Sequence, residues 1–92
     1  MKEPTLQDIE YGLRGNPLTD FVEGWTFRVD EVSSNMYKID GWDLAEHHVS
    51  YFGTHPVEVL QKCIRRAQHI KEDKDLLSRL RSLLRSVLGN HD

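Results

Sequence analysis

The chain has 92 residues, a formal net charge of −3, 38% hydrophobic residues and 29% charged residues. This length holds one hydrophobic core, so we expect a single domain over residues 1–92. The composition is that of a globular protein and excludes a disordered chain. Because no apolar run exceeds two residues, we expect no signal peptide, no membrane span and a cytoplasmic location.

A short helix is predicted over residues 5–13. Leu6 and Ile9 lie at helical spacing, and Thr5 followed by Asp8 resembles a capping box. Glycine and proline residues directly after this stretch end the helix. Residues 18–23 are ambiguous, and one further helical turn is one interpretation of them.

A three-stranded antiparallel sheet is predicted in the middle of the chain. Apolar and polar residues alternate with a period of two along residues 25–30 and 37–40, and again in a third strand over 46–52. A turn at 33–35 and a loop after Gly41 connect these strands. Both connections are too short for parallel crossovers, so the strands form a meander.

Two helices are predicted after the sheet, over residues 56–70 and 76–88. Thr54 is a suitable N-cap and Pro56 belongs in a first helical turn. The charged run 71–75 separates two apolar stripes, which differ in direction by roughly 140° at about 100° per residue. Either the chain turns in this run and the last helix folds back, or one long helix presents two different faces.

These elements predict an α+β fold, with a three-stranded antiparallel sheet, a short N-terminal helix and two C-terminal helices. Cys63 lies in the first apolar stripe and is expected to be a small buried hydrophobe. The predicted core consists of Leu6, Ile9, Trp25, Phe27, Val29, Tyr37, Ile39, Val49, Tyr51, Leu60, Ile64, Ala67, Leu80, Leu83 and Leu84.

The charge is unevenly distributed along the chain. Residues 1–54 contain ten acids and four bases, which gives −6, whereas residues 55–92 contain five acids and eight bases, which gives +3. This polarity fits an acidic face that meets a basic partner, and it fits equally a head-to-tail contact between copies of the chain.

The sequence does not indicate reaction chemistry. His47 and His48 are adjacent on a predicted strand and therefore point to opposite faces, so they cannot easily chelate one ion. The serines lack a nucleophile-elbow motif, and no glycine-rich loop leads into a helix to hold phosphate. We expect a non-enzymatic protein without a metal or a cofactor.

Two aromatic residues fall off the parity of the predicted core. Trp42 lies on the water-facing parity near acidic residues, and Phe52 does the same at the end of the third strand. A Trp surrounded by acids is a plausible hot spot for a basic protein partner, whereas the alternative is that Trp42 packs over the sheet edge or under the N-terminal helix. The predicted partner-binding residues are Asp40, Trp42, Asp43, Glu46, His48 and Phe52.

Two other functions fit the C-terminal half. A nucleic-acid-binding module would use bases on the polar sides of the helices, although arginine alternating with serine also describes a solvated face. These bases are Lys62, Arg65, Arg66, Arg79, Arg81 and Arg85. A homo-oligomer would instead pair an apolar stripe formed by Leu76, Leu80, Leu83, Leu84 and Val87.

The order of three strands and a helix resembles the core of HicB-type antitoxins, a reduced double-stranded-RNA-binding fold. The similar stretch runs over residues 25–70, with the hairpin FRVDEVSSNMYKID and then GTHP leading into VEVLQKCIRRA. Such antitoxins usually carry a separate DNA-binding segment after the core, whereas a leucine-rich helix follows here. HPVE stands where double-stranded-RNA binders have a basic helix start, so we transfer no binding residues.

The small size and acidic charge are also similar in style to those of bacterial toxin-immunity proteins and phage-encoded inhibitors of host defence. These likenesses and the charge pattern together predict a protein that binds and neutralises another macromolecule through an acidic surface.

Overall fold

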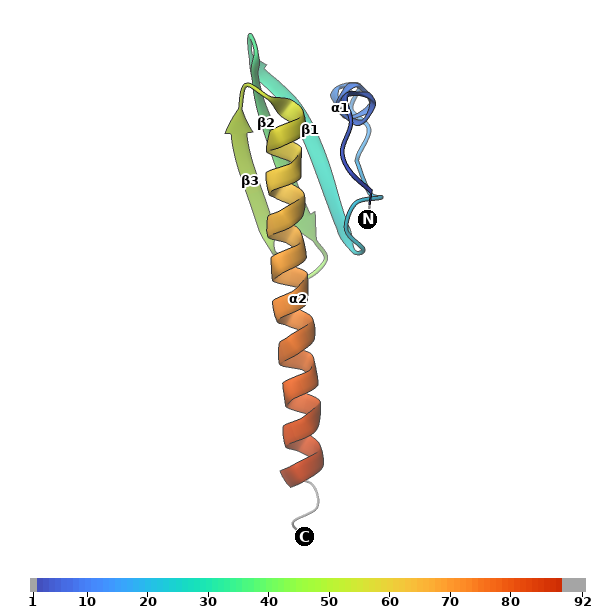
Figure 1. Cartoon of the computed structure of the whole chain (residues 1–92), viewed down its shortest axis with the longest axis vertical. Helices are drawn as coiled ribbons and strands as arrows, with labels where there is room; N and C mark the ends of the chain where they lie inside the picture. The colour runs from blue at the N-terminus through green and yellow to red at the C-terminus, as the bar shows by residue number, and fades with distance from the viewer. Residues whose placement is uncertain (1, 89–92) are drawn as a thin grey trace.

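The computed structural model describes residues 2–88 and shows a three-stranded sheet with a helix across one face (Figure 1). The sheet order is β1-β2-β3 with antiparallel pairing throughout, which confirms the predicted α+β class and meander. The elements in chain order are α1 (Leu6–Leu13), β1 (Trp25–Ser33), β2 (Met36–Asp43), β3 (His48–Gly53) and α2 (Pro56–Leu88).

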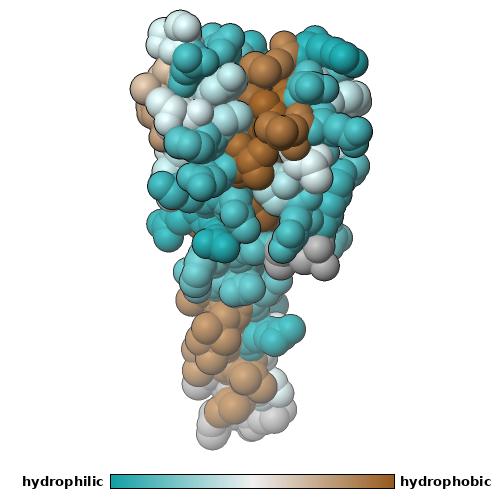
Figure 2. Space-filling view, turned by 45° about the horizontal axis from the view of Figure 1, so that its top comes forward, coloured by the Kyte–Doolittle hydropathy of each residue, from teal (hydrophilic) through white to brown (hydrophobic). Residues whose placement is uncertain are grey.

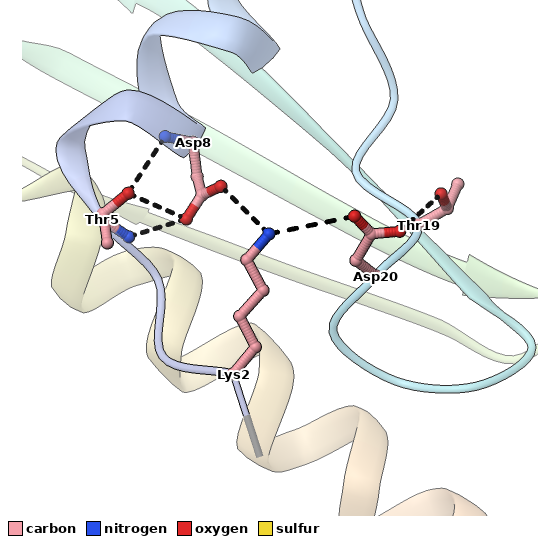
Figure 3. A network of polar contacts seen from close by, with 5 residues as sticks. All are labelled: Lys2, Thr5, Asp8, Thr19 and Asp20. Carbon is pink, nitrogen blue, oxygen red and sulfur yellow. Dashed lines mark hydrogen bonds and ion pairs between the residues drawn. The ribbon is translucent and has the colours of Figure 1, made fainter.

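The predicted capping box at the start of α1 is confirmed. The Asp8 backbone N–H donates to Thr5 Oγ1 at 3.4 Å, and the Thr5 N–H donates to Asp8 Oδ2 at 2.8 Å. Lys2 Nζ lies 3.5 Å from Asp8 Oδ1 and 3.8 Å from Asp20 Oδ2 (Figure 3). The network therefore satisfies the first helical N–H groups and ties the start of α1 to the loop that follows the helix.

The segment after α1 contributes to the core. The backbone N–H and C=O of Leu18 each bond to Phe27 at 2.8 Å, so Leu18 forms an isolated bridge along the outer edge of β1. Phe21 and Val22 are also buried. The ambiguous segment 18–23 therefore does not begin with a helical turn, because the Leu18 backbone groups pair with the sheet.

The middle of the sheet depends on a close approach at Gly41. Phe27, Gly41 and Val49 are paired across the three strands, and a Cβ added to Gly41 would lie 2.6 Å from Phe27 Cε1. Only glycine leaves room for the Phe27 ring there. The loop predicted directly after Gly41 begins later, because β2 continues to Asp43 and β3 starts at His48.

The core lies between the sheet, α1 and the first half of α2, and most of its predicted members are confirmed. Those buried are Ile9, Trp25, Phe27, Val29, Ile39, Val49, Leu60, Ile64 and Ala67. Tyr37 and Tyr51 are only half-buried. The core also includes Leu18, Phe21, Val22, Val59 and Cys63.

Cys63 is a core residue, as predicted. Its side chain is fully buried, and its Sγ donates to the Ile39 carbonyl at 3.4 Å. Burial, reinforced by the negative charge of Asp40, raises the pKa of the thiol to about 12. The thiol therefore stays protonated at neutral pH and is a poor nucleophile.

The two predicted C-terminal helices are one helix. α2 runs without interruption from Pro56 to Leu88, and the charged run 71–75 forms one of its turns. Residues 57–88 contain neither glycine nor proline, so nothing in the chain ends the helix at this point. The predicted stop at Gly89 and Asn90, like the side chain of Leu88, lies outside the described residues.

The start of α2 differs by one residue from the prediction. The His55 carbonyl accepts from the Val59 N–H at 3.0 Å, which places His55 at the N-cap and Pro56 at the first helical position. Thr54, the predicted N-cap, instead places its Oγ1 3.0 Å from His55 Nδ1.

The second half of α2 projects away from the globular part (Figure 1). The described chain has a radius of gyration of 17.1 Å and extents of 64 × 20 × 18 Å, whereas a compact chain of this length has a radius near 12 Å, by about 2.2·N^0.38. Leu80, Leu83 and Leu84 are therefore not core residues, being 46%, 64% and 60% exposed. Leu6 was also wrongly placed in the core, since its side chain is exposed.

Candidate partner-binding surfaces

The face of the sheet opposite α2 carries side chains of alternating parity, which we call the open face. The cross-strand register aligns them in three rows. These rows are Thr26–Trp42–His48, Arg28–Asp40–Ser50 and Asp30–Lys38–Phe52. Antiparallel sheets commonly leave one face to solvent, and polar residues usually occupy it.

Two aromatic side chains interrupt this polar pattern. Trp42 is 39% exposed on the central strand, and Phe52 is 62% exposed on the edge strand β3. Lys38 Nζ lies 5.7 Å from the centroid of the Phe52 ring, close enough for a cation–π contact. Trp42 is thus neither packed under α1 nor part of the core, and its ring is available on the open face.

The charged residues of the open face are largely compensated by one another. Asp40 lies 3.9 Å from Lys38 Nζ and 3.2 Å from His48 Nε2. Arg28 Nε lies 3.4 Å from Asp30 Oδ2 on the same strand. These ion pairs are partly exposed and each contributes little to stability, but they fix polar side chains between the two aromatics.

Asp43 does not join the open face. Its Oδ1 accepts from the Ala45 and His47 N–H groups at 3.0 and 2.9 Å, and its Oδ2 lies 2.9 Å from His47 Nδ1. The side chain is only 10% exposed. Asp43 therefore holds the loop between β2 and β3 together, and Glu46 occupies the same loop with a positive φ of 68°.

Four of the six predicted partner-binding residues are thus brought together on one face. Asp40, Trp42, His48 and Phe52 share the open face, whereas Asp43 ends β2 on the opposite parity and Glu46 lies in the adjoining loop. The acidic ring expected around Trp42 does not form, because strand β2 continues through Trp42 and sends Asp43 to the opposite parity.

Sequence reasoning missed Leu44 in this loop. Leu44 is fully exposed and borders an open hollow of about 290 Å³ together with Trp42 and Thr26. A signal was present, since a leucine between Asp43 and Ala45 in a tight loop cannot reach the core. Leu44 extends the apolar surface next to Trp42.

Protonation of Asp43 provides a test of the loop. Burial alone would raise the pKa of this carboxyl, but the bonds with His47 and Ala45 outweigh burial and lower it from 3.8. Because the pKa of Asp43 is lower in the folded chain than in the unfolded chain, the ionised carboxylate stabilises the fold at any pH above the unfolded-state pKa. This stabilisation is lost as the pH falls through the folded-state pKa. We expect Asp43→Asn to be less stable than the natural chain at about pH 7, with the difference shrinking toward about pH 3. Urea unfolding at both pH values measures the difference in free energy of unfolding between the natural chain and Asp43→Asn. A difference that does not change with pH would contradict the role of the Asp43 carboxylate in holding the loop.

The six candidate nucleic-acid-binding bases do not form one surface. All are exposed on α2, but at about 100° per residue Lys62, Arg65 and Arg66 lie on a different side of the helix from Arg81 and Arg85. A phosphate backbone tracking α2 would therefore meet only part of the set. No observation on the described residues favours nucleic acid over a protein partner.

The second half of α2 exposes an apolar stripe, which we call the leucine face. Hydrophobic surface gathers on this projecting part of the helix in Figure 2. Its residues are Leu76, Leu77, Leu80, Leu83, Leu84 and Val87, which are 46–64% exposed. An exposed stripe of this kind marks a contact site.

No family model, curated protein or solved structure matches the chain. Neither described helix is long and apolar enough to cross a membrane. The two surfaces themselves are therefore the features from which function is inferred.

Proposed function

We propose that this protein is non-enzymatic and that it binds and neutralises a macromolecular partner through the open face, in the manner of immunity proteins, antitoxins or phage-type inhibitors. The observation that supports the proposal is the exposure of Trp42 and Phe52 on a sheet face that no described element covers. The resemblance to HicB-type antitoxin cores favours the same class of function.

The open face carries residue types that commonly anchor protein interfaces. Aromatic residues and arginine are enriched in interfaces, and a few aromatic anchors commonly supply most of the binding energy. Trp42 and Phe52 lie in the two outer rows, and the Arg28–Asp40–Ser50 row lies between them. A partner with two apolar pockets and a polar centre would match this arrangement.

The charge of the chain indicates a basic partner. Residues 1–54 have ten acids and four bases, a net charge of −6, while the ion pairs neutralise much of the open face itself. Exposed acids outside these ion pairs include Glu31 near the end of β1 and Glu46 in the loop between β2 and β3. A net acidic charge accelerates the approach of a basic protein more than it adds to the affinity of the final complex.

A capture experiment with matched variants tests the proposal. The tagged protein is incubated with lysate of its source organism, and bound material is eluted with salt and analysed for protein and nucleic acid. We expect one stoichiometric basic protein. Trp42→Ala should then bind it at least about thirtyfold more weakly, the cost of about 2 kcal/mol typical of a hot-spot truncation. Phe52→Ala should weaken binding in the same direction.

The control is Tyr11→Ala. Tyr11 is 52% exposed on α1 and lies away from the open face, so its loss should leave binding unchanged. Equal binding by the natural chain and by folded Trp42→Ala would contradict the proposal. Recovery of nucleic acid without a protein would do so as well and would move attention to the bases of α2.

A further inference from the structure

The leucine face has the spacing of a helix-pairing seam. Leu76, Leu80, Leu83 and Val87 follow one another at intervals of four, three and four residues, the pattern by which two helices interdigitate. Leu77 and Leu84 widen the seam on one side. The polar side of the same segment carries Ser78, Ser82 and Ser86.

The exposed apolar side chains of this seam need to be buried against another surface. The projecting residues 71–88 form about 27 Å of helix at 1.5 Å per residue, and a helix of this length is marginal in water without packing. Covering the six apolar side chains on each of two copies removes a total area near the ~1,000 Å² that a stable interface needs. The face is therefore large enough for a dimer.

We infer that a second copy of this chain covers the leucine face, and that the two α2 helices pair antiparallel. The first reason is the charge along the projecting half. Residues 71–75 contain three acids and two lysines, a net charge of −1, whereas residues 76–88 contain three arginines and no acid, a net charge of +3. An antiparallel pair places the end of each basic segment beside the net-negative segment of the other copy, whereas a parallel pair sets the two basic segments side by side along their whole length.

The second reason is that a parallel pair would bring like charges together. Arg66, Asp73, Leu80 and Val87 are spaced by seven residues, so they form one line along the side of α2 that carries the leucine face. Equal positions face each other in a parallel pair, and Arg66 would meet Arg66 while Asp73 would meet Asp73. The antiparallel pair avoids both contacts.

The antiparallel pair also fits the shape of the molecule. With a two-fold axis near Leu80, Leu76 of one copy lies beside Leu84 of the other, and Asp73 lies beside Val87. The globular parts then lie at opposite ends of the paired helices and do not collide (Figure 1). Both open faces remain available, so the dimer is independent of the partner proposed for the open face.

The mass in solution tests the dimer. Light scattering after size exclusion, from micromolar to millimolar protein, should give a dimer that Leu80→Glu weakens at least about a hundredfold, because each copy then buries a carboxylate. Ser82→Glu places the same charge on the opposite side of the helix and should leave the dimer intact. A monomer for the natural chain at all concentrations, or equal effects of the two variants, would overturn the inference.

Disulfide crosslinking tests the orientation. Asp73→Cys combined with Val87→Cys in one chain should give a crosslinked dimer under mild oxidation, because these two positions face each other in the antiparallel pair, whereas Asp73→Cys alone should not crosslink. Cys63 is fully buried and does not compete. In a parallel dimer each position faces itself, so crosslinking of Asp73→Cys alone, or no crosslinking of the double variant, would overturn the antiparallel arrangement.

Discussion

Replacing Phe27 by alanine is expected to lower the free energy of unfolding by about 3–5 kcal/mol, the usual cost of removing a buried phenyl ring. Phe27 has no exposed surface. Its ring centroid lies 6.3 Å from that of Trp25 in a stacked pair and 6.5 Å from that of Phe21 in an edge-to-face pair. A domain of this size has a stability of only about 5–15 kcal/mol, so the variant should be close to unfolding.

The same substitution on the other face of the sheet is the control. Phe52→Ala removes a 62% exposed ring whose packing is limited to contacts such as that with Lys38, and it should cost at most about 1 kcal/mol. Urea unfolding followed by circular dichroism compares the two variants. Equal losses of stability would show that the open face is packed in solution and would contradict the assignment of the two faces.

Leu60→Ala is expected to lower the free energy of unfolding by about 2–5 kcal/mol, whereas Leu80→Ala should change it by no more than about 0.5 kcal/mol in the monomer. Both residues lie on α2, but Leu60 is fully buried against the sheet and Leu80 is 46% exposed. Alanine and leucine have similar helix propensities, so the difference measures packing alone.

The measurement is thermal unfolding at two protein concentrations. At low concentration Leu80→Ala should match the natural chain, and at high concentration it should be less stable, because dimerisation stabilises the natural chain by mass action. Leu60→Ala should be less stable at both. A large concentration-independent loss for Leu80→Ala would indicate that the second half of α2 folds back onto its own domain.

The two proposed surfaces give the protein a simple organisation. Each globular part presents one open face, and the paired helices would hold two such faces at a fixed separation. A partner with two binding sites would then gain affinity through the high effective concentration of the second open face. The proposed neutralising function requires one open face, and the proposed dimer would strengthen it.

The strand pattern could be predicted because its period is local. Alternation along β1 and β2 assigns Trp25, Phe27, Val29 and Ile39 to the core, and each of them is buried. Once one face of a sheet is buried, parity alone separates inward from outward residues. The same rule places Asp40, His48 and Phe52 on the open face, which is why most of the candidate site was found.

The contribution of the segment after α1 could not be predicted in this way. Leu18 is buried because its backbone pairs with Phe27 at the edge of β1. A single bridge of this kind produces no periodic pattern in the sequence from which it could be predicted. The role of Asp43 could not be predicted for a similar reason. Asp43 takes the inward parity because β2 continues past Gly41, and the length of β2 depends on its pairing with β1 and β3.

The sequence by itself determined the α+β class, the antiparallel meander, the capping box of Thr5 and Asp8, and the existence of two apolar stripes in the last third of the chain, because these features depend on spacing between near neighbours. Only the tertiary structure decided that both stripes belong to one helix and that Leu80, Leu83 and Leu84 remain exposed. The reason is that sequence periodicity shows that a stripe needs cover but not what covers it. The sheet has room for the Leu60 side of α2 alone, and residues 71–88 extend beyond its end.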